Sequence, residues 1–280
     1  MAQVQEQRPV AVLSCAGTNR GLVRQLNEDS LLAEYPVFVV ADGMGGHAGG
    51  ELASAATVAA FRPLVGRQDV APEEIPALID AAQLAVAKIG TNGGAPGAGC
   101  TLTGAVAVRT PGQPPFWLVF NVGDSRTYTC YGGVLTQISV DHSLLQEMHD
   151  NGQLVGLSPD QYPPRNIITR AIGGDDYRAE YWSLTMSPGQ RLLMCSDGLT
   201  GEISDTVIAD ELSQPDPVEA TAANLIEFAL DEGGRDNISV IVVEVEGRAA
   251  GAPPVPQPIV FAPVNATNPL GDNDDEGGEQ

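Results

Sequence analysis

Short runs of apolar residues rich in Val, Ile and Phe recur along the chain, and each run is bounded by Gly, Asp or Pro. Runs of this length with turn-forming residues at their ends are typical of β-strands. The pattern predicts strands over residues 10–16, 29–34, 36–41, 101–109, 116–122, 126–131, 134–138, 179–186, 190–195 and 238–246.

Helical periodicity is clearest in two other segments. Apolar residues recur at three- and four-residue steps over 75–89 and over 218–229, as in helices with one buried face. A third helix is expected after the glycines near residue 50, whereas 150–178 has little periodicity and is interpreted as an irregular insertion. Because strands and helices come in separate blocks, the order favours an α+β layered sandwich over a doubly wound parallel sheet.

The last part of the chain has a different composition. Residues 249–271 carry no charge and contain six prolines, and an acidic segment follows them. A helix cannot run through so many prolines, so we predict a folded domain over 8–247 and a disordered, Pro-rich, acidic tail over 248–280. The first residues contain no basic segment followed by an apolar one, so we expect a cytoplasmic protein without a secretory signal.

Charge and cysteine content exclude several classes of function. The 280 residues include 36 Asp and Glu but only 14 Lys and Arg, for a formal net charge of −22. Nucleic acid and anionic membranes would be repelled by such a chain, so neither is an expected partner. The four cysteines are scattered without a C-x-x-C pair, which disfavours a zinc site and a dense disulfide framework.

Some of the excess acids stand at defined points of the predicted strands. Asp42, Asp124 and Asp197 each end an apolar run, and Asp236 directly precedes one. In an antiparallel sheet the end of one strand lies beside the start of its neighbour, so these carboxylates are expected at one edge. Each Asp alone is explained better as a turn or helix cap. Together they predict a site for hard cations such as Mg²⁺ or Mn²⁺.

Two arginines precede another acidic pair. Arg20 and Arg24 stand shortly before Glu28 and Asp29. Arginine is the preferred bidentate partner of phosphate, and a two-metal site holds a hydroxide suited to attack on phosphorus. Either arginine is alternatively a solvated surface residue.

The sequence resembles the metal-dependent type 2C (PPM) family of serine/threonine protein phosphatases, in its bacterial form. The resemblance covers about 220 residues in family order. The matching segments are GLVRQLNEDS (21–30), VVADGMGGHAGGELAS (39–54), GCTLTGAV (99–106), NVGDSR (121–126), DHS (141–143), ITRAIGG (168–174), LLMCSDGLT (192–200) and GRDNISVIVV (234–243). It implies a four-layer α-β-β-α sandwich with two central antiparallel sheets flanked by helices.

The resemblance also implies roles for the acids. Asp42 would bridge two metals and the Gly43 carbonyl would bind one of them, while Asp197 and Asp236 would complete the coordination. Glu28 and Asp29 would act through metal-bound water. A third, weaker metal site would be formed by Asp124 with Asp197. Arg24, and not Arg20, matches the phosphate-binding arginine.

The histidines are less well defined by the resemblance. Eukaryotic relatives carry a histidine where this chain has Met44. His47 is therefore the candidate for protonating the leaving group, with a non-catalytic histidine at a helix entry as the alternative. His142 is expected to begin a helix, with Asp141 as its N-cap.

The implied function is hydrolysis of phosphoserine and phosphothreonine in proteins by a water or hydroxide that bridges two Mn²⁺ or Mg²⁺ ions. The expected partners are phosphoproteins modified by serine/threonine kinases, and the expected state is a monomer. The alternatives are a catalytically silent regulatory binding module and a two-metal nuclease, which the acidic charge disfavours. Residues 150–178 align with the variable flap of the family, which suggests an influence on substrate choice.

Overall fold

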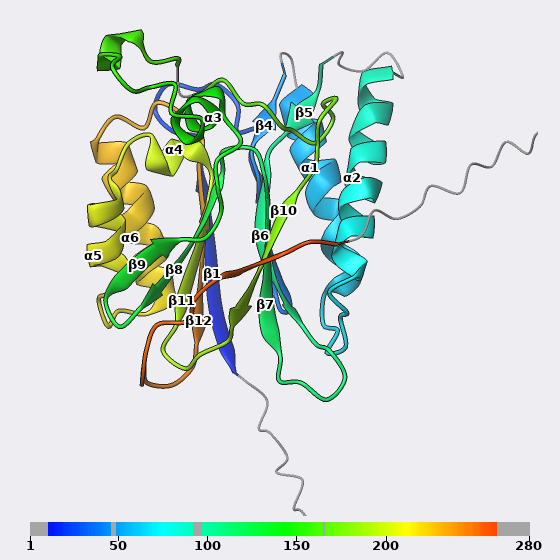
Figure 1. The fold of residues 1–280 in the computed structure, drawn as a ribbon, viewed down its shortest axis with the longest axis vertical. Helices are drawn as coiled ribbons and strands as arrows, with labels where there is room; N and C mark the ends of the chain where they lie inside the picture. Colours follow the sequence, from blue (N-terminus) through cyan, green and yellow to red (C-terminus); the bar gives the residue numbers. More distant parts are fainter. Residues whose placement is uncertain (1–10, 46–48, 92–96, 165, 262–280) are drawn as a thin grey trace, which may run out of the picture.

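A computed structural model describes residues 11–45, 49–91, 97–164 and 166–261. Two antiparallel sheets pack face to face, and helices cover their outer faces (Figure 1). Sheet A contains, in spatial order, β1 (Val12–Asn19), β12 (Ile238–Val245), β11 (Arg191–Cys195), β8 (Arg126–Tyr131) and β9 (Val134–Gln137). Sheet B contains β13 (Gln257–Ile259), β10 (Glu180–Thr185), β7 (Phe116–Val122), β6 (Leu102–Val108), β3 (Val37–Ala41) and β2 (Ser30–Glu34).

The central strands are apolar without interruption because both of their faces are covered. In β3, Val37 and Val39 pack toward the helices over sheet B, whereas Phe38 and Val40 pack between the two sheets. In β12, Val240 and Val242 face helices over sheet A, and Ile241 and Val243 face sheet B. A strand with two buried faces loses the usual alternation of apolar and polar residues.

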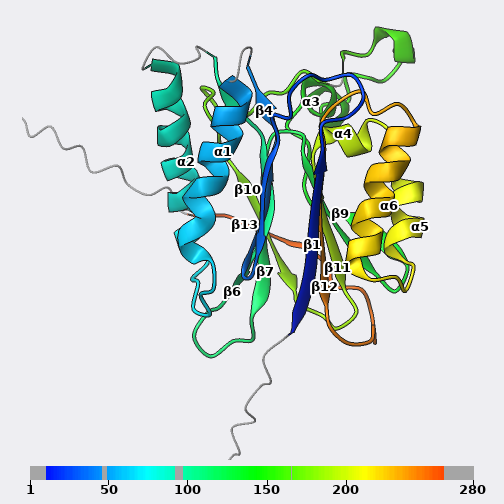
Figure 2. The same ribbon diagram turned by 180° about the vertical axis from the view of Figure 1, so that it is seen from behind.

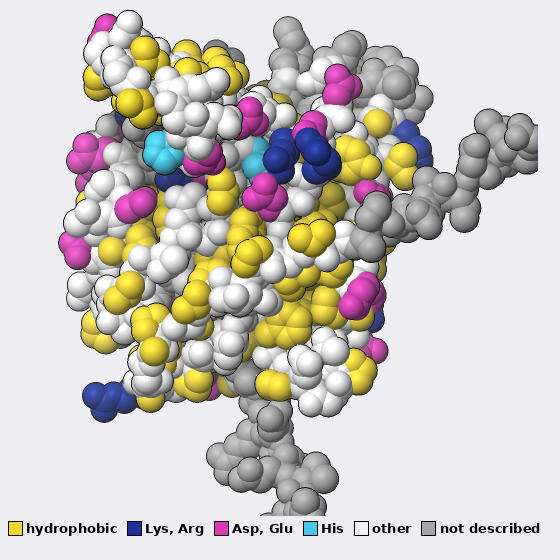
Figure 3. Space-filling model, in the orientation of Figure 1, with side chains coloured by type: hydrophobic (Ala, Val, Ile, Leu, Met, Phe, Trp, Pro, Cys, Tyr) yellow, Lys and Arg dark blue, Asp and Glu magenta, His cyan; other side chains and the backbone are white. Residues whose placement is uncertain are grey.

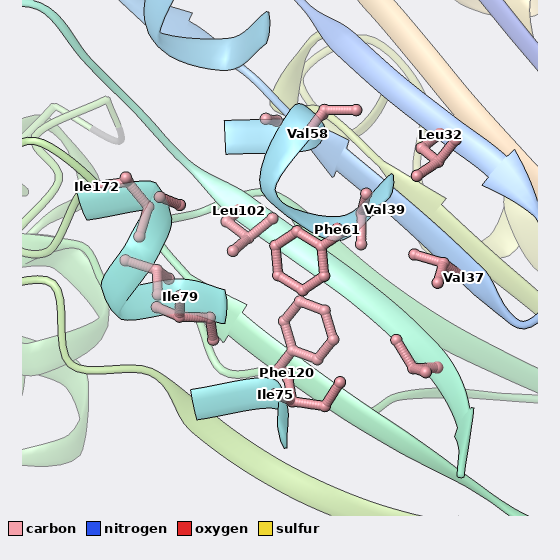
Figure 4. Close-up of a cluster of buried hydrophobic side chains, with 14 of the residues drawn as sticks. Leu32, Val37, Val39, Val58, Phe61, Ile75, Ile79, Leu102, Phe120 and Ile172 are labelled. Carbon is pink, nitrogen blue, oxygen red and sulfur yellow. The ribbon is translucent and has the colours of Figure 1, made fainter. Parts of the chain in front are cut away.

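Helices form the two outer layers. α1 (Gly49–Phe61) and α2 (Glu74–Thr91) cover sheet B, and α5 (Asp205–Leu212) and α6 (Val218–Asp231) cover sheet A (Figure 2). Under α1 and α2 the rings of Phe61 and Phe120 stack with centroids 5.4 Å apart (Figure 4). The predicted four-layer α-β-β-α sandwich is therefore confirmed.

Short elements gather at one end of the sandwich, the upper end in Figure 1. They are β4 (Gly43–Met44), β5 (Gly99–Cys100), α3 (Leu144–Asp150) and α4 (Asp197–Thr200). The described residues between 151 and 179 form turns, bends and isolated bridges with a single 3-10 turn at Pro159–Gln161, as the lack of periodicity predicts. No helix in the described ranges is long and apolar enough to cross a membrane.

The prediction of a disordered tail from residue 248 is wrong for its first part. The Tyr131 hydroxyl bonds the backbone of Ala250, and β13 then pairs antiparallel with β10. Phe261 meets Tyr181 edge to face at 4.8 Å. Proline is tolerated in this strand because β13 lies at the edge of the sheet, and its apolar residues gain burial by covering β10. Residues 262–280 lie outside the described ranges.

Candidate metal and phosphate site

A pocket of ≈ 360 Å³ opens at the end of the sandwich that carries the short elements. The four strand-end aspartates all line it. Its described lining consists of Arg24, Glu28, Asp42, Gly43, Met44, Gly45, Thr101, Asp124, Asn166, Ile168, Asp197, Asp236 and Asn237. Figure 3 shows charged side chains and histidines toward this end, and hydrophobic side chains over the middle of the same face.

The aspartates converge for two reasons, of which sequence reasoning supplied one. Asp197 follows β11 and Asp236 precedes β12, and these strands are antiparallel neighbours as expected. Asp42 follows β3 and Asp124 follows β7, and both strands pair antiparallel with β6, so they run parallel to each other and end at the same edge. Packing of sheet A on sheet B then brings the two pairs together.

Close backbone packing holds Asp42. Its N–H donates to the Thr101 hydroxyl at 3.1 Å, and its carbonyl accepts from the Thr101 N–H at 2.8 Å. A Cβ on the next residue, Gly43, would lie 2.3 Å from the Gly50 carbonyl oxygen and 2.4 Å from that of Glu28. Only glycine fits at position 43, because any Cβ would collide with these carbonyl oxygens. The close packing of this turn fixes the backbone from which the Asp42 side chain lines the pocket.

Asn237 organises the wall opposite Asp42. Its side-chain amide donates to the carbonyls of Arg20 and Leu26, both at 2.9 Å, and its Oδ1 accepts from the Glu28 N–H at 2.8 Å. The 20–28 loop is thereby attached to the residue that follows Asp236. Sequence reasoning missed this role, although Asn237 stands inside the GRDNIS segment, because its partners are about 210 positions away in the chain.

The carboxylates are poorly compensated. Burial, with repulsion from neighbouring aspartates, raises the pKa of Asp42 well above its usual value and also raises the pKa of Asp197. Burial likewise raises the pKa of Asp124 to about 7 and that of Asp29 to about 6. Arg24 is the only cationic side chain among the described residues of the lining. Buried carboxylates in this state favour either a proton or a cation.

These residues have the donor chemistry that a hard divalent cation requires. All of the acids offer oxygen, and the buried Asp29 Oδ1 has no hydrogen-bond partner although Oδ2 accepts from Ser196 at 3.0 Å. Among the described residues, no three His, Cys, Asp or Glu side chains already surround one ion-sized point. Five of the six predicted acids line one pocket without being closed into a ligand cage, whereas Asp29 is not among the described residues of the lining.

Comparison with known sequences identifies the family. The family described as Protein phosphatase 2C matches residues 16–241. The chain belongs to this family. Serine/threonine protein phosphatase PstP of Mycobacterium tuberculosis is 38% identical over 235 residues, which are 82% of this chain but only 44% of that protein. This chain thus matches less than half the length of that relative.

Two further similarities cover nearly all of the compared protein. Serine/threonine phosphatase stp of Listeria welshimeri is 30% identical over 251 residues, which are 81% of this chain and 93% of that protein. The solved catalytic domain of PstP in complex with two manganese ions has a TM-score of 0.75 and 34% identity, covering 84% of this chain and 99% of that one.

The two arginines of this protein phosphatase 2C chain have different positions. Arg24 lines the pocket, and its guanidinium donates to the Asp236 carboxylate at 2.6 Å. That bond raises the pKa of Arg24. Arg20 is exposed, and within the described part of the chain its side chain donates to the Gln25 carbonyl alone, at 3.4 Å. The placement agrees with Arg24 as the candidate for binding phosphate.

Sequence reasoning singled out two histidines of this family member. His47 lies outside the described residues. His142 does not begin a helix: α3 begins at Leu144 with Ser143 as its N-cap, because the Ser143 hydroxyl accepts from the Gln146 N–H. Nδ1 of the buried His142 accepts from the Gly123 N–H at 3.1 Å, next to Asp124. Asp141 instead binds Arg126 at 2.6 Å, so it is not a cap.

Proposed function

We propose that this protein hydrolyses phosphoserine and phosphothreonine monoesters in proteins with the help of Mn²⁺ or Mg²⁺. The observation that carries the proposal is one pocket that is lined by four aspartates from the ends of two different sheets together with an arginine: Asp42, Asp124, Asp197, Asp236 and Arg24. Family membership and the two manganese ions in the PstP structure support it. In this proposal the protein works as a cytoplasmic monomer on phosphoproteins that serine/threonine kinases produce.

The acids have distinct proposed tasks. Asp42, the Gly43 carbonyl, Asp197 and Asp236 would hold two cations, and the pocket offers Asp124 to a third, weaker site. Glu28 and Asp29 would support these cations through water. When bound, Mn²⁺ or Mg²⁺ supplies Lewis-acid chemistry that makes water a nucleophile near neutral pH.

Other groups of the chain position the substrate. Arg24 has the fork geometry to bind two non-reacting phosphate oxygens, and it lines the pocket from a loop that Asn237 holds in place. His47 is proposed to protonate the leaving serine or threonine oxygen. Asn166 and Ile168 bring the flap to the rim of the pocket, which supports an influence of residues 150–178 on substrate choice.

The test is turnover of p-nitrophenyl phosphate with added Mn²⁺. We expect Asp42→Ala and Asp236→Ala to abolish turnover while the proteins remain folded, and Asp231→Ala, an exposed acid on α6, to keep it. Full activity in both site variants would refute the metal-site assignment. Absence of turnover in the unmodified protein would instead favour the silent regulatory module.

A further inference from the structure

The 20–28 loop exposes apolar side chains beside the pocket. Leu22 and Val23 are each 66% exposed and Leu26 is 53% exposed, and Arg24, which lines the pocket, stands among them. We call Leu22, Val23 and Leu26 the apolar lip. Single exposed apolar residues are ordinary, but three within five positions at the mouth of a site indicate an interaction surface.

The lip is held in a fixed shape. The Leu22 N–H donates to the Gly234 carbonyl at 2.7 Å, and the Asn237 amide holds the carbonyls of Arg20 and Leu26. Gly21 has a φ of +76°, and a Cβ there would lie 2.2 Å from the Asp236 carbonyl oxygen. A surface fixed in this way binds without ordering a loop, which removes one of the entropic costs of association.

The flap also brings apolar side chains to the pocket. Ile168 lines the pocket and its neighbour Ile167 is 41% exposed. Both ribbon views place the loop between β1 and β2 at the end of the molecule that carries the flap (Figures 1 and 2). Apolar side chains therefore flank the carboxylate-lined pocket on the loop side and on the flap side.

We infer that the apolar lip docks an apolar side chain that flanks the phosphorylated residue of a protein substrate; this inference rests on the proposed function. The occupant is a polypeptide segment because the lip is continuous with the pocket through Arg24. When Arg24 holds the phosphate ester, the residues on either side of the phosphorylated one lie across the rim of the pocket. An apolar side chain among them would be removed from water by packing against the apolar lip. A substrate without flanking residues has nothing to place there.

The experiment uses phosphothreonine peptides in an alanine background, with Leu or Asn placed in turn at each of three positions on either side. Turnover of each peptide is expressed relative to that of p-nitrophenyl phosphate, which has no flanking residues. At one or more positions we expect kcat/KM for the Leu peptide to exceed that for the Asn peptide about tenfold. No preference at any position would overturn the inference.

Variants then locate the preference. In the double variant Val23→Asn, Leu26→Asn the ratio of Leu to Asn peptides should fall to about twofold or less, since both side chains are exposed and the backbone contacts are kept. Leu84→Asn, a matched change at an exposed leucine of α2, should keep the tenfold ratio. A preference that survives in the double variant, or that is lost equally in Leu84→Asn, would overturn the inference.

Peptide binding separates this inference from the proposed function. Fluorescence anisotropy of the labelled peptides measures affinity with or without turnover. Tighter binding of Leu peptides that disappears in the double variant supports the lip even if the protein hydrolyses nothing. Hydrolysis of all peptides at equal rates, with equal affinities, supports the phosphatase and contradicts the lip.

Discussion

Arg191 and Asp42 carry charges inside the same fold, but their surroundings are opposite. The Arg191 side chain, 9% exposed, binds Glu244 at 2.7 Å on the neighbouring strand β12. It also donates to the carbonyls of Leu212, Gln214 and Asp216. Asp42 sits among other acids, and burial with their repulsion raises its pKa.

The difference separates a structural charge from a functional one. Arg191 is neutralised entirely by groups of the chain, and its network joins sheet A to the loop before α6. Arg24 is the only cationic side chain among the described residues of the pocket lining. Arg126, which also acts on Asp124 and Asp197, is already paired with another acid. The negative charge of the pocket is therefore available to a bound cation. A site that binds cations must keep such uncompensated charge, and it does so at the expense of stability in the metal-free protein.

The largest effect on stability is expected from Arg191→Met. The change leaves the Glu244 carboxylate and several carbonyls without their donor, and breaking a buried pair costs about 3–5 kcal/mol. Urea unfolding should show this loss, while turnover per folded molecule stays the same. The double variant Arg191→Met, Glu244→Gln should recover part of the loss. A change below about 1 kcal/mol would mean that this network is not structural.

The next largest effect is the pH dependence of the metal-free protein. Asp124 titrates near its usual value when unfolded but at about 7 when folded, because burial and repulsion from Asp197 and Asp141 raise its pKa. Because the pKa of Asp124 is higher in the folded than in the unfolded state, its contribution to the free energy of unfolding is fully present below about pH 4. This contribution is lost as the pH rises through 7. The full loss is on the order of 4 kcal/mol, from a shift of roughly three pKa units at about 1.4 kcal/mol per unit.

Urea midpoints at pH 5 and pH 8 in EDTA measure this dependence. The metal-free protein should be less stable at pH 8, and Mn²⁺ should remove most of the difference. Asp124→Asn is the matched control and should make the metal-free profile less steep, while the dependence that remains comes from the other acids whose pKa values are raised. Equal stability at both pH values in EDTA would contradict the uncompensated state of the pocket.

A smaller gain in stability is expected from Asp42→Asn. Without metal, the amide keeps the shape of the side chain and removes one repelled charge, so the free energy of unfolding should rise by about 1–2 kcal/mol. With Mn²⁺, the same variant should show a smaller increase in melting temperature than the unmodified protein. Asp231→Asn, an exposed acid, should change neither value. Destabilisation of the metal-free Asp42→Asn protein would show that the carboxylate is needed for folding.

The sequence predicted the layered sandwich because strands and helices come in separate blocks, and the resemblance implied its four layers. Runs such as Val37–Ala41 are apolar at five consecutive positions because both faces of the strand are buried. The helix α5 was missed because Asp205–Leu212 is short and has several polar residues. The strand β13 was missed because proline argues against strands, whereas the partner β10 supplies an edge that tolerates it.

The acids of the site were predictable, but the groups that hold them were not. Asp197 and Asp236 stand where apolar runs end or begin, and strand direction alone brings these two positions together. Asp42 joins them only when sheet B packs on sheet A. Asn237 and Thr101 act through hydrogen bonds to residues 209 and 59 positions away in the chain, and no sequence pattern marks those partners.

The smallest effect distinguishes Arg24 from Arg20 and completes the comparison with Arg191. Arg191 is held by several groups of its own chain, whereas the half-exposed Arg24 is bound to Asp236, an acid proposed to bind metal. Arg24→Ala should raise KM for p-nitrophenyl phosphate about tenfold, the effect expected when phosphate binding loses one charged hydrogen bond. The value of kcat should change less, because the lost bond holds the phosphate before as well as during the reaction. Arg20→Ala, which removes an exposed arginine outside the pocket, should change KM less than about twofold. An unchanged KM in Arg24→Ala would assign phosphate binding to another group and leave Arg24 as a partner of Asp236 alone.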